Sequence, residues 1–189
     1  MSTSLPVVRP ALALALAAGL ATAPAHAQVA PAVTPTYQEW SVYGGDPGGS
    51  KYSTLADIQK TNVKGLKVAW EWRPEDLPLE QFGTRPGNFQ TTPLMIDNVL
   101  YVSTQYNRVV ALEPETGKTL WAFDPKTYED GQPANGTGYV HRGVSAWRDS
   151  RDGNRLRIFL ATRWRLFCLD AATGVPVKGF GTDGWIDLT

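Results

Sequence analysis

VVALEPETGKTLWAF, residues 109–123, reads as a strand, a tight turn and a second strand. The turn contains Thr116-Gly117, and glycine readily adopts the positive φ that a tight chain reversal needs. Residues 166–180 repeat the pattern 57 positions later, as Gly174 against Gly117 shows, and residues 67–72 repeat its last third upstream. A unit copied along a chain indicates a repeat architecture, so the repeat determines the fold.

The pattern around these copies predicts short strands and no long helix. Two sets of four strands are expected, at residues 92–96, 99–104, 108–113 and 118–123 and at residues 144–147, 157–161, 165–170 and 175–180, with a further strand at 66–72. Turn residues such as Asp97-Asn98 separate neighbouring strands. Four-stranded meanders that repeat every 40 to 60 or so residues are typical of β-propeller blades. An ordinary β-sandwich is the alternative.

Trp121 lies on the outer strand of its set, where a large ring can cover the neighbouring blade. Burial of an aromatic side chain of this size contributes roughly 2–3 kcal/mol. In the second copy Lys178 stands where the tryptophan is expected, and Phe180 is the candidate to seal that blade instead.

The N-terminus has the form of a secretory signal. Arg9 precedes an Ala/Leu-rich run, and Ala25-His26-Ala27 is a small-x-small cleavage site, so residues 1–27 are expected to be removed. The run is shorter than the roughly 20 apolar residues of a transmembrane span. Residues 28–37 are Pro/Ala-rich and are expected to form a disordered lead-in. These features predict a periplasmic protein without a transmembrane anchor in this span.

The charged residues exclude some partners. The chain has 18 basic and 18 acidic side chains, and loss of the signal removes only Arg9. A nearly neutral chain does not attract nucleic acid without a basic patch. Cys168 is the single cysteine and fits a buried small hydrophobe better than a reactive thiol. His141 is the single histidine after cleavage, and a packing role is favoured because no orienting carboxylate lies beside it in the sequence.

Several motifs follow one another in a fixed order. They are the docking repeat Ala111-x-Glu113-x-x-Thr116-Gly117-x-x-x-Trp121, the opening Trp40-x-x-Tyr43-Gly44-Gly45-Asp46 with Lys51-Tyr52-Ser53, and the segments 62–70, 90–94, 100–102 and 142–147. Together they resemble the quinoprotein dehydrogenases, which carry pyrroloquinoline quinone (PQQ) on an eight-bladed β-propeller. The resemblance covers residues 38–189.

The resemblance implies an all-β chain that is part of an eight-bladed ring. Residues 66–72 would supply the outer strand of the last blade, blades one and two would follow, and blade three would start near Trp185. A whole ring needs roughly 400 or more residues, so we expect residues 38–189 to be the N-terminal part of a longer propeller domain.

Four residues fall at positions where the resemblance implies contact with PQQ. Arg142 corresponds to an arginine that pairs with a carboxylate of the cofactor, and a surface salt bridge is its alternative role. Gln90 and Thr162 correspond to polar contacts with the cofactor, or else they cap a turn or a strand edge. Tyr106 lies on a hairpin tip and serves the cofactor or is a plain turn residue.

The resemblance also implies a function. Members of the family transfer a hydride from a sugar, polyol or alcohol to PQQ, with Ca²⁺ as Lewis acid and an aspartate as base. No residue here matches the Ca²⁺ ligands or the base, which are expected beyond residue 189, so this span alone is expected to be inactive. Gly136 and Thr137 replace the adjacent cysteines of alcohol-oxidising members, which favours the sugar or polyol branch. The electron acceptor, a quinone or a cytochrome, stays open. The alternative is a non-catalytic exported propeller scaffold.

Overall fold

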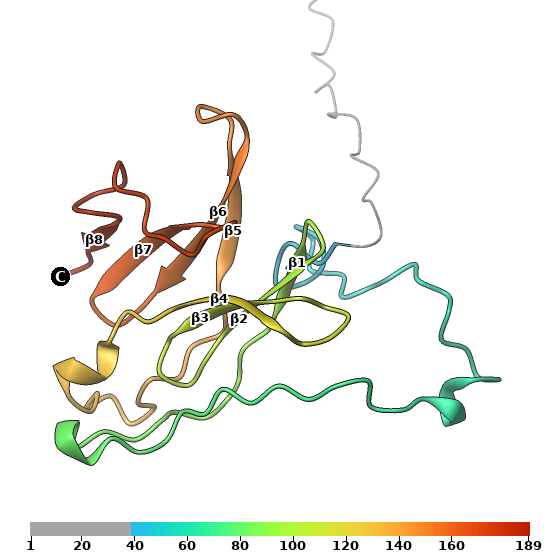
Figure 1. Cartoon of the computed structure of the whole chain (residues 1–189), viewed down its shortest axis with the longest axis horizontal. Helices are drawn as coiled ribbons and strands as arrows, with labels where there is room; N and C mark the ends of the chain where they lie inside the picture. The colour runs from blue at the N-terminus through green and yellow to red at the C-terminus, as the bar shows by residue number, and fades with distance from the viewer. Residues whose placement is uncertain (1–38) are drawn as a thin grey trace, which may run out of the picture. The chain divides into compact units, whose positions relative to one another are not determined.

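The computed structural model describes residues 39–189, and two antiparallel sheets of four strands make up most of their regular structure (Figure 1). The first sheet runs in the order β1 (Leu94–Ile96), β2 (Val99–Ser103), β3 (Val109–Leu112) and β4 (Thr119–Phe123). The second runs β5 (Ser145–Asp149), β6 (Arg155–Ala161), β7 (Arg165–Asp170) and β8 (Trp185–Asp187). The expected signal at 1–27 and lead-in at 28–37 lie outside the described residues.

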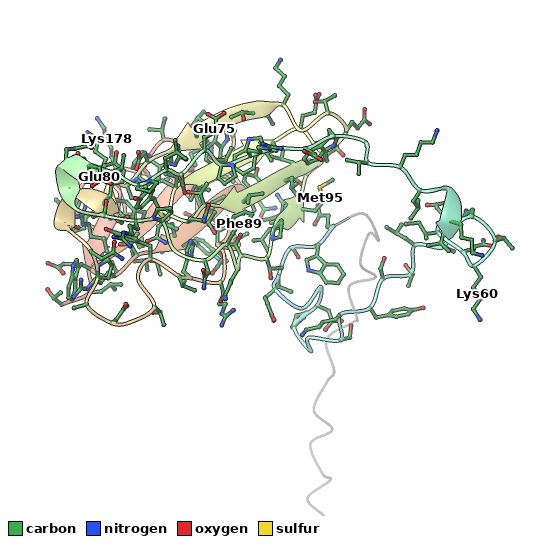
Figure 2. The ribbon with its side chains drawn as sticks, turned by 90° about the horizontal axis from the view of Figure 1, so that it is seen from below. Lys60, Glu75, Glu80, Phe89, Met95 and Lys178 are labelled. Carbon is green, nitrogen blue, oxygen red and sulfur yellow. The ribbon has the colours of Figure 1, made fainter. Side chains whose placement is uncertain are left out.

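Three short 3₁₀ turns are the helices of this part of the chain: η1 (Val63–Gly65), η2 (Glu80–Phe82) and η3 (Thr127–Asp130). None of them is long and apolar enough to cross a membrane. Figure 2 shows Lys60 on a segment near η1 that lies clear of the strands, and Met95 of β1 beside the N-terminal loop. There the backbone of Met95 exchanges two hydrogen bonds with Trp40, at 2.7 and 3.0 Å.

The first sheet is apolar on both faces. Alternate residues of a strand point to opposite sides, so one strand can serve two cores. On β3, Val109 and Ala111 pack in a cluster shared with the second sheet, whereas Val110 and Leu112 pack in a second cluster that Trp70 and Trp72 cover. The sheet is therefore enclosed between neighbours on both sides, as a blade inside a propeller is.

A tryptophan docked on a glycine turn joins the two sheets. Trp121 of β4 donates its indole N–H to the carbonyl oxygen of Ala171 at 2.9 Å, in the turn that follows β7. Its ring lies over Gly174, where a Cβ atom would come within 2.4 Å of the ring carbon Cε3. Gly174 has a φ of +72°, so the turn needs glycine for its backbone and for the ring. The role expected for Trp121 is confirmed.

The same contact recurs one unit upstream. Trp70 donates its indole N–H to the carbonyl oxygen of Pro114 at 2.9 Å, and a Cβ atom on Gly117 would lie 2.5 Å from Trp70 Cε3. Two copies of one docking contact, with a common core between the sheets, define a partial β-propeller and not a sandwich. The all-β prediction is thus confirmed.

Residues 66–72 form no strand, contrary to the expectation, because none of the described residues is their ladder partner. Leu66 has extended dihedral angles, with φ −62° and ψ 140°, and the segment is held through Trp70. The expected strand boundaries in the two sheets are otherwise correct to within about two residues, apart from the last strand.

The fourth strand of the second sheet was predicted wrongly. Residues 175–180 make only an isolated bridge, between Pro176 and Leu169, and the strand paired with β7 is β8, with Trp185 opposite Phe167. Proline has no N–H to continue a ladder, and the chain leaves the sheet after Val177. Trp185 therefore belongs to the second blade and does not start a third.

The expected substitute for the missing tryptophan is Phe180, and its role in sealing the second blade against a following blade stays a prediction. Phe180 packs edge-on against Phe159 of β6, with ring centroids 5.7 Å apart, and so contacts its own sheet. Lys178 lies in the loop that precedes β8.

We predict that Gly174→Ala destabilises the protein by about 1–3 kcal/mol more than Gly153→Ala, because its methyl group overlaps the indole of Trp121. Gly153 is the matched control: its φ is +59°, but a Cβ there meets nothing within 4 Å. Urea unfolding of the two variants beside the wild type measures the difference. Equal losses would show that backbone strain alone is responsible and that the ring contact contributes nothing.

Candidate functional site

The four candidate residues lie at one end of the two sheets. Gln90 precedes β1 and Tyr106 is in the β2–β3 turn, while Arg142 precedes β5 and Thr162 is in the β6–β7 turn. In an antiparallel meander, the entry to the first strand and the turn after the second are at the same end. The glycine turns that receive Trp70 and Trp121 follow the third strands and are at the opposite end. Docking and candidate site are thus separated by the length of the strands.

The structure brings Gln90 and Arg142 together. Arg142 Nη1 donates a hydrogen bond to Gln90 Oε1 at 3.0 Å, and both side chains are exposed. The two residues are 52 positions apart in sequence and come from different sheets. Two residues this far apart in the sequence can share a hydrogen bond only where the backbone holds their two segments close together.

Gly143 explains how the two chain segments come close. The N–H of Thr92 donates to the carbonyl oxygen of Arg142 at 2.9 Å, which ties the entry of β1 to the entry of β5. Gly143 has a φ of +133°, and a Cβ there would lie 2.8 Å from the carbonyl oxygen of Thr92. A residue with a side chain at 143 would therefore push these two segments apart.

The Gln90–Arg142 pair fits a carboxylate ligand. Among the ion pairs of the described residues, none involves Arg142, although most other arginines in this part of the chain are paired. One guanidinium N–H is used on Gln90, and the remaining donors of the fork are open to solvent. An exposed arginine with its charge uncompensated matches a carboxylate in geometry and in charge.

Thr162 closes its own turn. Its hydroxyl donates to the carbonyl oxygen of Arg165 at 3.1 Å and accepts the N–H of Arg165 at 3.2 Å. These contacts are those of the capping alternative. Thr162 is half-buried, and its contact with a cofactor stays a prediction.

Tyr106 is buried, with 2% of its surface exposed. Its ring packs edge-on against Tyr128 and Tyr139, at centroid distances of 5.6 and 5.2 Å. Its N–H donates to Asp76 Oδ2 at 2.9 Å, and Arg108 makes an ion pair with the same carboxylate. The residue therefore packs the β2–β3 turn, and its contact with a cofactor stays a prediction.

No sequence pattern indicates Asp76, whose side chain is 1% exposed. It comes from a segment of irregular structure and holds the turn through Arg108, which also donates to the carbonyl oxygen of Pro74. Removal of one partner of a buried ion pair is strongly destabilising, so this pair fixes the turn that carries Tyr106.

His141 lies beside Arg142 but enters a different space. It lines a hollow together with Thr162, while neither Gln90 nor Arg142 does. Burial lowers the pKa of His141 below its ordinary value, and backbone hydrogen bonds with Thr104 and Gly143 oppose that shift. The imidazole is therefore neutral at pH 7.

Within residues 39–189, no group of three or more His, Cys, Asp or Glu side chains is placed to hold a metal ion. The expectation that Ca²⁺ ligands lie beyond residue 189 stays a prediction.

Comparison with known proteins assigns the family. The family model described as PQQ glucose/ethanol/alcohol dehydrogenase, β-propeller domain, matches residues 40–189. The chain belongs to the PQQ dehydrogenase β-propeller family. The resemblance expected from the motifs is confirmed, and the two sheets are two blades of such a propeller.

Curated members of the PQQ dehydrogenase family are similar over most of this chain. Quinoprotein glucose dehydrogenase A of Acinetobacter calcoaceticus is 32% identical over 87% of this chain and 22% of its own length. Quinohemoprotein alcohol dehydrogenase of Comamonas testosteroni is 31% identical over 74% of this chain and 18% of its own length. The chain thus spans about a fifth of the length of these relatives.

Solved structures of the PQQ dehydrogenase family agree with the fold. The crystal structure of the Comamonas testosteroni quinohemoprotein alcohol dehydrogenase matches 72% of this chain with a TM-score of 0.55 and 28% identity. A europium-containing methanol dehydrogenase matches 74% with a TM-score of 0.56 and 22% identity, which supports the fold alone.

We predict that Cys168 does not react with an aromatic disulfide reagent at pH 8 in the native protein. The thiol is 4% exposed, and burial raises its pKa, so thiolate is scarce and the sulfur is inaccessible. Absorbance of the released thiol is followed with and without urea, and one equivalent is expected only after unfolding. Rapid release from folded protein would instead show a reactive thiol.

Proposed function

We propose that this chain is part of a periplasmic PQQ-dependent dehydrogenase that oxidises a sugar, polyol or alcohol. The observation that carries the proposal is the Gln90–Arg142 pair: a solvent-open guanidinium, without an acidic partner among the described residues, beside an amide at the site end of the blades. Family membership and the signal-like N-terminus support it.

In this proposal Arg142 and Gln90 bind one carboxylate of the cofactor. Arg142 supplies the charge and the planar fork, while Gln90 accepts one N–H and so fixes the orientation of the fork. Gly143 and Thr92 hold the two segments at the distance that this contact needs. When bound, PQQ supplies the oxidising carbonyl that receives a hydride from the substrate.

The loop before Arg142 suggests which substrate class the protein oxidises. Gly136 and Thr137 stand where alcohol-oxidising members carry adjacent cysteines, and this difference favours a sugar or polyol as substrate. The Ca²⁺ ligands and the catalytic base are assigned to parts of the protein beyond residue 189, and the electron acceptor is a quinone or a cytochrome. On this proposal, the span from 38 to 189 alone binds part of a cofactor and does not turn over.

We predict that Arg142→Ala weakens PQQ binding by the full-length protein about 10- to 100-fold, since a hydrogen-bonded charge pair is lost. Quenching of tryptophan fluorescence during PQQ titration measures the dissociation constant. Arg151→Ala is the matched control, because that side chain is 82% exposed and lies in the β5–β6 turn at the opposite end of the sheet.

Equal PQQ affinity in Arg142→Ala and the wild type would contradict the assignment of Arg142. If the wild type also fails to bind PQQ at micromolar concentration, the non-catalytic scaffold is the correct function.

A further inference from the structure

The connection between β4 and β5 contains an asparagine that is followed directly by glycine, Asn135-Gly136, and both residues are exposed. The main-chain nitrogen after an asparagine can attack the side-chain carboxamide and close a five-membered ring, and glycine has no Cβ to obstruct this approach. The other asparagines are followed by larger residues: Asn62 and Asn98 by valine, Asn88 by phenylalanine, and Asn107 and Asn154 by arginine. Asn135 is therefore the asparagine of this sequence that its neighbour shields least.

The attacking nitrogen, that of Gly136, makes no contact that would hold it back. Among residues 39–189, no carbonyl or side chain accepts a hydrogen bond from its N–H. Gly136 has a φ of +74°, and a Cβ atom placed on it would meet nothing within 4 Å. Solvent can therefore reach this N–H and remove its proton without breaking any contact of the fold.

The carboxamide of Asn135 is held by the two residues that follow Gly136. Its Oδ1 accepts the N–H of Gly138 at 2.8 Å and the N–H of Thr137 at 3.1 Å. These contacts fold the carboxamide back toward the peptide group of Gly136, which lies between Asn135 and both donors in the chain. Attack on Cγ would place negative charge on Oδ1, to which the two N–H groups already donate. The bend therefore stabilises the tetrahedral intermediate of ring closure.

The ends of this bend are anchored in the fold. The Tyr139 hydroxyl donates to the carbonyl oxygen of Gly131 at 2.7 Å, and the carbonyl oxygen of Tyr139 accepts Asn107 Nδ2 at 2.8 Å. Tyr139 itself is buried. Because the bend is tied down at both ends, its two N–H donors stay aimed at Asn135 Oδ1 in the folded protein, whereas an unfolded chain aims them only transiently.

We propose that Asn135 is a site of spontaneous deamidation and that the folded loop accelerates the reaction. The Gly136 nitrogen forms a bond to Asn135 Cγ and loses its proton to water, and Nδ2 leaves as ammonia. Water then opens the resulting succinimide at either carbonyl, which yields aspartate or isoaspartate at position 135. The net change is hydrolysis of an amide to a carboxylate and ammonia, so the reaction consumes only water.

Deamidation adds a negative charge beside an open cation. Asn135 and Arg163 line one hollow of about 310 Å³, and no ion pair among the described residues involves Arg163. The Asp130 carboxylate in the same lining is already paired with Arg165 at 2.5 Å. A carboxylate at position 135 therefore supplies a counter-charge that this hollow lacks. The inference depends on the chemistry of the loop and is independent of the proposed function.

Ageing of the full-length protein in mildly alkaline buffer tests the proposal. Peptide mapping by mass spectrometry measures conversion at Asn135, and enzymatic methylation of isoaspartate detects the second product independently. A synthetic peptide of residues 131–140 in the same buffer gives the rate without the fold. We expect conversion in the native protein to be about 3- to 10-fold faster than in the peptide, since two hydrogen bonds to the developing charge are formed in advance. Urea is expected to lower the rate in the protein to that of the peptide.

Tyr139→Phe tests whether anchoring of the bend matters. Loss of the hydroxyl releases the contact with Gly131, so conversion at Asn135 is expected to slow about 2- to 5-fold toward the peptide rate. Tyr128→Phe is the matched control, because that hydroxyl donates to Asp124 at 3.0 Å, outside the bend, and the rate is expected to stay unchanged. Asn135→Gln keeps an amide that would have to close a larger ring, and is expected to give no product at this position.

Three results would overturn the proposal. The first is conversion at Asn135 that is no faster in the native protein than in the peptide, which would mean that the loop protects the carboxamide or leaves it unaffected. The second is equal conversion at Asn154, which is exposed and followed by arginine, since the rate would then not depend on glycine or on the bend. The third is an unchanged rate in Tyr139→Phe, which would remove the accelerating role of the fold.

Discussion

The indole of one sheet docked on a glycine turn of the next is the contact on which the two-sheet arrangement depends. It combines a hydrogen bond to a backbone carbonyl with a large apolar ring laid on a surface that has no Cβ. The hydrogen bond fixes direction, since only one indole N–H and one carbonyl are involved, while the ring supplies apolar area. Trp70 and Trp121 make the same contact, so one type of interaction holds both ring-bearing segments to the turn of the next unit.

Docking at one end of the strands leaves the other end open for chemistry. The turns that receive the tryptophans are short and conformationally fixed by glycine, whereas the opposite end carries long connections such as residues 124–144. The chain segments at that end bring Gln90 and Arg142 together. The end with the glycine turns thus fixes the sheets, and the sheets position the connections at the other end, as is common where loops on a fixed scaffold carry function.

The sequence predicted the strands and turns that local residue patterns determine. It did not predict the features that depend on tertiary packing. Seven of the eight strands and the docking role of Trp121 follow from alternation and from Thr116-Gly117, which act locally. The position of the last strand was missed because a fixed spacing of 57 residues assumes equal loops, while β8 begins only at Trp185, after a longer connection from β7. Pro176 and the glycines at 179, 181 and 184 were the available signal that a strand there is interrupted.

In the candidate site, too, local motifs predicted some features, and others depend on tertiary contacts. Gln90 and Arg142 were identified through motifs, but only the fold shows that they share a hydrogen bond across 52 residues. Burial of Tyr106 and the use of the Thr162 hydroxyl in its own turn depend on contacts that no local pattern encodes. Asp76 had no sequence signal, because its role is defined by what surrounds it in space.

The direction of the docking contact has a consequence for synthesis. Each indole precedes its acceptor carbonyl in the chain, by 44 residues for Trp70 and by 50 for Trp121. During translation, which proceeds from the N-terminus, both rings leave the ribosome before the turns that will cover them exist. Trp70 and Trp121 therefore each stay uncovered until the turn that follows is made, and a pause in elongation at such a point would prolong the time in which a chaperone can bind the exposed ring.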